Sequence, residues 1–326
     1  MKLGTLKNPQ RRDGDLVVVS RDSTRAVKAT TIAPSLREAL ENWSECHLKL
    51  ELLAKELEEG RRTDAFEVDE EEFHSPLPRT FQWADGSAFL QHVKLVRMAR
   101  KAPLPETLFT VPLMYQGGGD DFLAPHEAIP QCDPTHGTDF EGEVVVVTDF
   151  VPMGISAEKA CEKILLVMLA NDVSLRGLIP EELASGFGFF QSKPSTAFSP
   201  FALTVDELGS AWREARVHLP LLVEYNGRFF GNADAGEMHF GFGQLIAHAA
   251  RTRNLTAGTI VGSGTVANED PGRGSSCLAE KRMLEQINHG KIETPFMKPG
   301  DRIRIEMKDA QGRSLFGSID QKVTKI

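Results

Sequence analysis

The stretch TDFEGEVVVVTD, residues 138–149, joins two glutamates to a run of four valines. β-Branched side chains favour extended backbone, so Val144–Val147 predict a packed strand. Residues two apart on a strand share one face, and Glu141 and Glu143 should therefore point the same way. At roughly 3.3 Å of rise per residue, their carboxylates would lie about 7 Å apart and repel each other where water is scarce. The stretch thus predicts a core strand with a neutralising partner at its entrance.

The composition is that of an ordinary globular protein. The chain has 326 residues, 41% hydrophobic and 25% charged, which is enough for one main domain with an appendage or for two domains. A net charge of −9 argues against a general nucleic-acid binder. Without a signal peptide or an apolar run of membrane-spanning length, we expect a cytoplasmic protein with no membrane partner. The scattered cysteines indicate reduced thiols rather than a zinc site or disulfides.

Two regions of the chain differ in their patterns. Residues 1–75 hold a strand-like opening, a helix with a capping box formed by Ser35 and Glu38, and an acidic connection. Residues 76–326 alternate short apolar strands with turns, as in the apolar run at residues 164–170, and contain few amphipathic helices. We therefore predict a strand-dominated α+β catalytic body over residues 76–326, preceded by a small N-terminal α/β domain over residues 1–75.

A second stretch, LANDVSLRG at residues 169–177, turns polar where an apolar strand ends. Asp172, Ser174 and Arg176 share one face if the strand continues, which would place an acid and a guanidinium at its tip. A strand that is buried along its length and polar at its tip often opens onto a cleft, where Asp172 would join the two glutamates. For this stretch alone, a structural ion pair or a strand cap is the simpler alternative.

A third stretch, QWADGSAFLQHVKLVRMARK at residues 82–101, contains an acid and a base. If a helix begins near Asp85, His92 falls on nearly the same stripe about two turns along. Taken alone, such an aspartate is usually an N-cap, and such a histidine is more often a packing or surface residue. The pair therefore acquires a functional meaning only together with the other stretches.

Motifs that would indicate other enzymes fail on inspection. The stretch GFGQLI, which begins at Gly241, lacks the third glycine of a dinucleotide fingerprint, and the sequence has no G-x-x-x-x-G-K-[ST] motif. The stretch VGSGT around Ser263 is not a nucleophile elbow, because Val261 stands where a glycine is required. Nucleotide-binding enzymes and serine hydrolases are therefore disfavoured.

Five motifs occur together in an order that resembles the fumarylacetoacetate hydrolase family, from about Leu77 to the end. They are Asp-x6-His, Glu-x-Glu before a β-branched strand, Asn-Asp-x-Ser-x-Arg, a lysine in FFQSKPSTAFSP, and GSGT followed by a late glutamate. The resemblance implies the mixed β-sandwich or β-roll fold of that family for the C-terminal domain, and a homodimer. It also implies a divalent cation held by four carboxylates, namely Asp85, Glu141, Glu143 and Asp172.

The same resemblance implies roles for further residues. His92 would be the general base, Glu280 the acid that orients it, and Lys193 the cation that stabilises developing negative charge. Substrate contacts would come from Arg176, Tyr115, Thr265 and Lys101. Carboxylate oxygens are hard ligands, so the expected cofactor is Mg²⁺ or Ca²⁺, with Mn²⁺ as a further option.

The activity implied by the resemblance is hydrolysis of a carbon–carbon bond in a small anionic β-diketo acid, as in the breakdown of tyrosine and other aromatic compounds. Ser87, Ile179 and Lys101 stand where the fumarylacetoacetases carry tyrosine, glutamine and arginine. The resemblance therefore supports a metal-dependent hydrolase more firmly than it supports fumarylacetoacetate as the substrate. A related acylpyruvate is the other candidate substrate. Two alternatives stay open: a hydratase or decarboxylase acting on a 2-keto acid, and a non-catalytic keto-acid binding protein.

Overall fold

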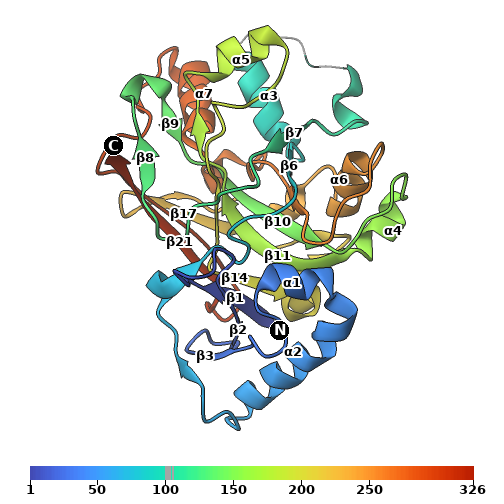
Figure 1. The fold of residues 1–326 in the computed structure, drawn as a ribbon. Coiled ribbons are helices and arrows are strands. Elements are labelled where there is room, and N and C mark those ends of the chain that lie inside the picture. The colour runs from blue at the N-terminus through green and yellow to red at the C-terminus, as the bar shows by residue number, and fades with distance from the viewer. Residues whose placement is uncertain (100–103, 105) are drawn as a thin grey trace.

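The structure is a computed structural model that describes residues 1–99, residue 104 and residues 106–326, without the side chains of residues 92, 96 and 99. Within these ranges, no helix is both long and apolar enough to cross a lipid bilayer. The described chain is rich in strands and contains mixed sheets (Figure 1), so the predicted strand-dominated α+β class is confirmed.

A large mixed sheet forms the centre of the molecule (Figure 1). Its strands are β1 (Lys2–Leu6), β2 (Asp15–Val19), β3 (Arg25–Lys28), β4 (Phe66–Glu67), β5 (Phe73–His74), β6 (Trp83–Gly86), β7 (Met114–Gly117), β10 (Gly142–Thr148), β11 (Ile164–Asn171), β13 (Ala197–Phe198), β14 (Phe201–Thr204) and β19 (Ile260–Gly262). The order across the sheet is β4-β3-β2-β1-β14-β11-β10-β19-β6-β7, while β13 pairs with β11 and β5 with β1. The apolar run at residues 164–170 is therefore a strand, as predicted.

A second sheet of five strands packs across the first. Its strands are β8 (Ile129–Gln131), β17 (Leu221–Tyr225), β18 (Arg228–Gly231), β20 (Arg302–Lys308) and β21 (Ser314–Lys325), in the order β18-β17-β20-β21-β8. Two short ribbons complete the strands, β9 (Thr138–Asp139) with β12 (Ser174–Leu175), and β15 (Trp212–Arg213) with β16 (Arg216–Val217).

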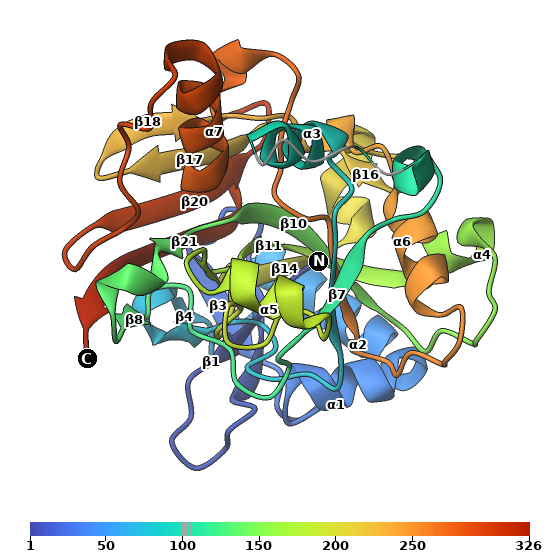
Figure 2. The ribbon, with the colours of Figure 1, turned by 90° about the horizontal axis from the view of Figure 1, so that it is seen from above.

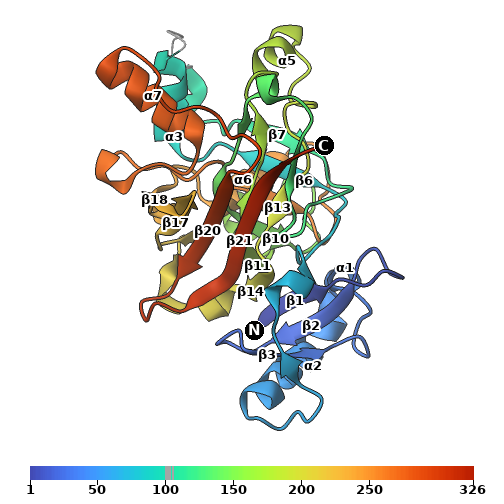
Figure 3. The ribbon, with the colours of Figure 1, turned by 90° about the vertical axis from the view of Figure 1, so that its left-hand side faces the viewer.

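The seven α-helices in the described part of the chain are α1 (Leu36–Glu41), α2 (Trp43–Glu58), α3 (Leu90–Ala99), α4 (Ala157–Cys161), α5 (Ile179–Ser185), α6 (Phe242–Ala249) and α7 (Leu278–His289). Five of them lie at opposite ends of the molecule, while α4 and α6 pack together at its side (Figure 1). Figure 3 shows α1 and α2 beside β1–β3 at one end, and α3, α5 and α7 at the other. Seen from above in Figure 2, α5 lies over strands of the large sheet, and α3 lies beside α7.

The capping box predicted at the start of the first helix forms only in part, because Glu38 bonds to the Ser35 hydroxyl rather than to the Ser35 backbone N–H. The Ser35 hydroxyl accepts the Glu38 N–H at 3.3 Å and donates to the Glu38 carboxylate at 3.2 Å. The single predicted helix is divided, however, because Asn42 leaves the helical conformation at φ −123° between α1 and α2. The helical segment ends at Glu58.

The run of valines lies between two cores, which explains why it does not alternate with polar residues. Val144 and Val146 pack in the cluster that includes β17 and β20, while Val145 and Val147 pack in the cluster beneath α1 and α2. All four valines are buried. A strand with apolar neighbours on both faces needs a continuous apolar sequence, and β10, like β11, packs against both cores.

The N-terminal strands extend the large sheet rather than form a separate one. β1 pairs antiparallel with β14, and the register places Leu3 opposite Ala202. The domain boundary predicted at residue 75 falls directly after β5, and it stays a prediction.

Candidate metal and active site

A cavity of about 350 Å³ lies where several strand ends of the large sheet meet. The C-terminal ends of β6, β11 and β19 and the N-terminal ends of β7 and β10 lie at one edge, because β10 runs antiparallel to β11 and β19, and β6 antiparallel to β7. The side chains that line the cavity come from these strand ends, from α3 and α5, and from the loops beside them: Asp85, Ser87, Phe89, Val93, Arg97, Leu113, Tyr115, Glu141, Arg176, Ile179, Leu183, Phe189, Lys193, Gly264 and Thr265.

Three buried carboxylates form a cluster at this edge. One oxygen from each of Asp85, Glu143 and Asp172 lies within 4.8 Å of the others. Asp85 accepts the Gly264 N–H at 3.0 Å. Both oxygens of Glu143 are buried and have no hydrogen-bond donor among the described residues. Buried carboxylate oxygens are costly without a partner, so the unsatisfied pair on Glu143 indicates a position for a cation.

The electrostatics of the cluster agree with that interpretation. Burial, together with the negative charge of Asp172, raises the pKa of Asp85 well above its usual value. Burial and the charges of Asp85 and Asp172 raise the pKa of Glu143 in the same direction. Closely spaced carboxylates that resist ionisation offer hard oxygen ligands to a divalent ion, which would relieve their repulsion. The residues present therefore fit a divalent cation.

Asp172 is the most heavily bonded member of the cluster. It accepts hydrogen bonds from the Tyr115 hydroxyl at 2.6 Å, from Lys193 Nζ at 2.6 Å and from the Thr196 hydroxyl at 2.7 Å. Burial, then the charges of Asp172 and Asp85, raise the pKa of Tyr115 well above its usual value, so this hydroxyl remains a donor. Tyr115 therefore lies at the candidate site, as the sequence predicted, and Thr196 is a contact that the sequence analysis missed.

Glu141 has different neighbours from the other three predicted ligands. Its Oε1 accepts from Arg176 at 2.6 Å, and its Oε2 accepts from Lys193 Nζ at 2.6 Å. Burial lowers the pKa of Lys193, but the negative charges of Asp172 and Glu141 have the larger combined effect and raise this pKa above its usual value. The structure thus places Glu141 beside the cluster and in contact with two cations, and its role as a fourth ligand stays a prediction.

Asp139 is a second residue that the sequence analysis missed. Its carboxylate accepts Arg176 Nε at 2.9 Å and the N–H groups of Leu278 and Ala279 at 2.8 and 2.9 Å. It therefore holds Arg176 and the first turn of α7 together, at a fully buried position. The sequence contained a signal for it, because Asp139 precedes Glu141 at the same two-residue spacing that separates the two glutamates.

The helical stripe predicted for Asp85 and His92 is wrong. Asp85 lies in β6, where its register partners are Gly262 of β19 and Tyr115 of β7, and α3 begins only at Leu90. The backbone around Asp85 is committed to strands on both sides, which leaves no freedom for a helical turn. Asp85 nevertheless joins the cluster, because β6 ends at the same edge as β19.

The continued strand predicted for Asp172, Ser174 and Arg176 is also wrong. β11 ends at Asn171, and Ser174 begins β12, which pairs with β9 in a separate ribbon. The Ser174 hydroxyl donates to the Asp172 carbonyl at 3.1 Å and stabilises the change of direction. Arg176 still reaches the site, but it does so through Asp139 and Glu141.

Glu280 lies in the first turn of α7, and α7 packs against α3, the helix that carries His92. The Glu280 side chain is buried, its Oε2 has no hydrogen-bond donor among the described residues, and burial raises its pKa to about 8. The predicted partner of this carboxyl is the His92 side chain, which lies outside the described part of the chain, and Lys101 lies outside it altogether. Thr265 lines the cavity, as its predicted substrate contact requires.

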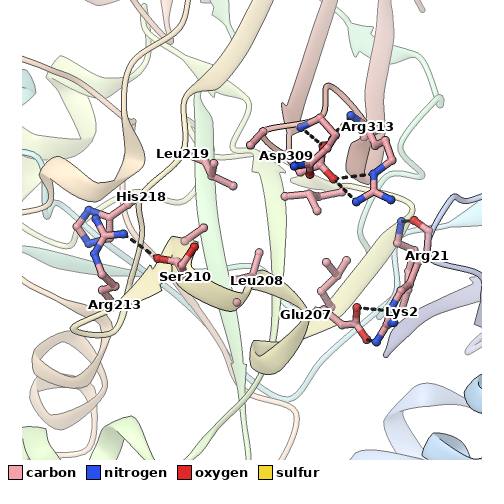
Figure 4. A pocket seen from close by; sticks show the side chains of 17 residues that line it. Lys2, Arg21, Glu207, Leu208, Ser210, Arg213, His218, Leu219, Asp309 and Arg313 are labelled. Carbon is pink, nitrogen blue, oxygen red and sulfur yellow. Dashed lines mark hydrogen bonds and ion pairs between the residues drawn. The ribbon is translucent and has the colours of Figure 1, made fainter.

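A second crevice, of about 430 Å³, lies between β1, the segment at residues 207–219 and the turn from β20 to β21 (Figure 4). Its carboxylates are paired, Glu207 with Arg21 at 2.9 Å and Asp309 with Arg313 at 2.8 Å, while Lys2 and Arg213 donate to main-chain carbonyls. These pairs satisfy the charges between neighbouring elements, so the cavity at the carboxylate cluster is the better candidate for a functional site.

Comparison with protein families agrees with this geometry. Residues 82–324 match the family described as Fumarylacetoacetate (FAA) hydrolase C-terminal, and residues 1–79 match Fumarylacetoacetase N-terminal domain 2. The strand-rich fold is thus that of a known family of enzymes, and the carboxylate cluster lies within the part of the chain that matches the C-terminal family. The chain belongs to the fumarylacetoacetate hydrolase family, and the resemblance inferred from its motifs is confirmed.

The relatives of the chain include different activities. The chain is 25% identical over 244 residues to the oxaloacetate tautomerase YisK of Bacillus subtilis (strain 168), a match that covers 74% of this chain and 71% of that protein. It is 25% identical over 211 residues to the fumarylacetoacetase of Caenorhabditis elegans, with 56% of this chain and 50% of that protein covered. The crystal structure of maleylpyruvate hydrolase from Sphingobium sp. SYK-6 matches the fold over both whole chains, with a TM-score of 0.67 and 14% identity.

Proposed function

We propose that this chain is a divalent-cation-dependent hydrolase that cleaves a carbon–carbon bond in a β-diketo acid, fumarylacetoacetate or a related acylpyruvate. We also propose that it acts in the cytoplasm as a homodimer. The observation that carries the hydrolase proposal is Glu280, because a buried carboxyl with an unsatisfied oxygen on α7, against α3, suits a partner for His92. A base oriented by an acid is the arrangement that activates a water molecule.

The carboxylates and cations have separate tasks in this proposal. Asp85, Glu143 and Asp172, with Glu141 as the fourth ligand, would hold Mg²⁺, Ca²⁺ or Mn²⁺. When bound, such an ion polarises the oxo groups of the substrate as a Lewis acid. The positive charges of Arg176 and Lys193 attract the anionic substrate, and the predicted contacts from Tyr115, Thr265 and Lys101 orient it.

The bond-breaking step follows from the proposed base. His92 takes a proton from water while the water oxygen bonds to the acyl carbonyl carbon. The bond from that carbon to the neighbouring methylene then breaks, and its electron pair forms an enolate. Lys193 stabilises this negative charge, and the proton held by His92 returns to the methylene carbon. The products are a carboxylic acid and a keto acid.

A second candidate is a different activity on a 2-keto acid, namely tautomerisation, hydration of a double bond, or decarboxylation. The 25% identity to an oxaloacetate tautomerase over 74% of the chain favours it. Lys193 supports it too, because a cation that stabilises an enolate serves both reactions. A protein that binds keto acids without turnover is the third alternative.

A panel of acylpyruvates, fumarylacetoacetate and oxaloacetate, assayed with each divalent cation and with chelator, separates these functions. Release of a carboxylic acid together with a keto acid supports the hydrolase. Enol–keto conversion without cleavage, a hydrated product or carbon dioxide would assign one of the alternatives, and binding without conversion would assign the last. We expect His92→Asn to lower hydrolytic turnover by roughly 100-fold to 10,000-fold. Near-normal turnover in this variant would rule out the base-activated mechanism.

A further inference from the structure

We infer that the site selects a substrate whose end remote from the reacting carbonyls is apolar and uncharged, such as an alkyl or aryl acyl group, rather than a second carboxylate. The inference rests on the proposed function and narrows its substrate class. It comes from the division of the cavity into a polar floor and an apolar wall.

The floor of the cavity is built from the strand ends and carries the charged chemistry. Asp85, Tyr115 and Glu141 stand at the ends of β6, β7 and β10, and Arg176 and Lys193 bond to the carboxylates there. Arg176 and Lys193 each bond to Glu141 on this floor, and the neighbouring Glu143 keeps two oxygens without a hydrogen-bond donor among the described residues. The keto-acid end of a substrate therefore belongs here.

The wall of the cavity is apolar, whereas the floor is charged. Six apolar side chains from α3, α5 and the loops beside them line it: Phe89, Val93, Leu113, Ile179, Leu183 and Phe189. Figure 1 shows α3 and α5 above the strand ends, and the side chains that they contribute line the same cavity as the floor. Leu113 is 41% exposed and Leu183 44% exposed, and they present apolar surface that an acyl group would cover.

The wall is fixed in place rather than loosely attached. The Glu182 carboxylate accepts the N–H groups of Phe190, Gln191 and Ser192 at 3.1, 2.6 and 3.1 Å. These bonds set the turn that carries Phe189 on one side and Lys193 on the other. The ring of Phe189 packs edge to face against Tyr115, with 5.4 Å between the centroids. These contacts therefore fix the position of Phe189 in the apolar wall relative to Tyr115 and Lys193 in the polar floor.

A carboxylate placed against this wall would lose water and meet mainly carbon atoms, which is costly, whereas each methylene would gain by burial. Arg97 is the competing feature, because it lies one helical turn beyond Val93 and also lines the cavity. The experiment therefore has to compare the two kinds of substrate end directly.

Calorimetric binding of 2-oxooctanoate and 2-oxooctanedioate in the presence of Mg²⁺ provides that comparison, because the two acids have the same length and differ only in the remote carboxylate. We expect the monoacid to bind about tenfold more tightly or better, and affinity to rise by up to about fourfold for each methylene added from 2-oxobutanoate upward. Leu183→Gln should narrow the difference between the two acids. The matched change Leu48→Gln, at a 71% exposed position on α2, should leave it unchanged.

Equal or tighter binding of the diacid would overturn the inference, and loss of that binding in Arg97→Ala would assign the remote carboxylate to Arg97. The proposed function is judged separately by turnover of the acylpyruvate panel. A protein that prefers the apolar acid but releases no cleavage products would keep this inference and lose the hydrolase. Cleavage products together with tighter binding of the diacid would keep the hydrolase proposal and overturn this inference.

Discussion

Lys193 donates a hydrogen bond from Nζ to Oδ2 of Asp172 at 2.6 Å. A cation of the protein itself therefore contacts one of the three clustered carboxylates that are proposed to bind the metal. The same nitrogen donates to Glu141 at 2.6 Å, and the lysine side chain is only 8% exposed. Asp172 thus lies between two sources of positive charge, the lysine and the proposed ion. The contributions of Lys193 and of the ion to stability can therefore be measured separately, by replacing the lysine and by removing the metal.

Lys193→Met should therefore destabilise the metal-free protein and increase its response to metal. Removing one partner of a buried ion pair costs roughly 3–5 kcal/mol, because the other charge is left uncompensated. Thermal unfolding with chelator and with Mg²⁺ measures both effects. Lys28→Met is the control, because Lys28 is 57% exposed in its pair with Asp15 and should change stability by less than about 1 kcal/mol. Equal unfolding temperatures for the two variants would contradict the proposed role.

Glu143→Gln should have the opposite effect on the metal-free protein. The substitution removes a buried carboxyl that cannot ionise beside Asp85 and Asp172 without desolvation and repulsion, so the unfolding temperature in chelator should rise. The stabilisation on adding Mg²⁺ or Ca²⁺, which for the unaltered protein reaches about 2.7 kcal/mol at one hundred times Kd, should disappear. A metal response that survives unchanged in this variant would remove Glu143 from the ligand set.

Glu280 predicts a defined pH dependence of stability. Its pKa is raised to about 8 by burial, so between the unfolded carboxyl value and pH 8 the folded state holds a proton that the unfolded state has released. Folding is then increasingly disfavoured as pH rises through this window, by at most ~1.4 kcal/mol per unit. Glu280→Gln should remove the slope and be more stable than the unaltered protein near pH 8. The exposed Glu237→Gln should keep the slope, and a parallel loss in both variants would contradict the assignment.

Glu182→Ala should loosen the turn at residues 190–192. Partial burial would raise the pKa of Glu182, but hydrogen bonds from the Ser192 hydroxyl and three backbone N–H groups lower it, so the carboxylate is the form that holds the turn. Chymotrypsin should cleave the variant faster at Phe187 and Phe190, which are 100% and 86% exposed. The unaltered protein should show the same acceleration only as pH falls and Glu182 is protonated. The neighbouring Glu181→Ala is the matched control, and faster cleavage there as well would indicate general loosening of α5.

The sequence was sufficient for features that depend on near neighbours. Four β-branched residues predict a strand wherever they lie, and Ser35 caps a helix through contacts within one turn. The cluster of Asp85, Glu143 and Asp172 was found because family motifs preserve residue types in a fixed order. The strand and the helix cap share one property, namely that the signal and its cause lie in the same stretch, whereas the cluster joins residues from three separate stretches.

The errors arose where the deciding partner lies far along the chain. Asp85 would start a helix if its local sequence decided, but β19, about 175 residues away, pairs with β6 and keeps it extended. The spacing before Glu141 marks Asp139 but does not reveal its role, which comes from its distant partners Arg176, Leu278 and Ala279. Non-local pairing of this kind leaves no periodic trace in the sequence.

The pairing of β1 with β14 makes the first seventy-odd residues a poor candidate for removal or exchange. Cutting them away would leave β14 with a row of unpaired backbone N–H and C=O groups, which is a template for association with other chains. A transplanted N-terminal region from a relative would have to reproduce the alignment of Leu3 with Ala202, since a slip of one residue would turn its apolar side chains to the wrong face. Shuffling between family members is therefore better attempted at the loops above the cavity than at the junction that the two family matches suggest.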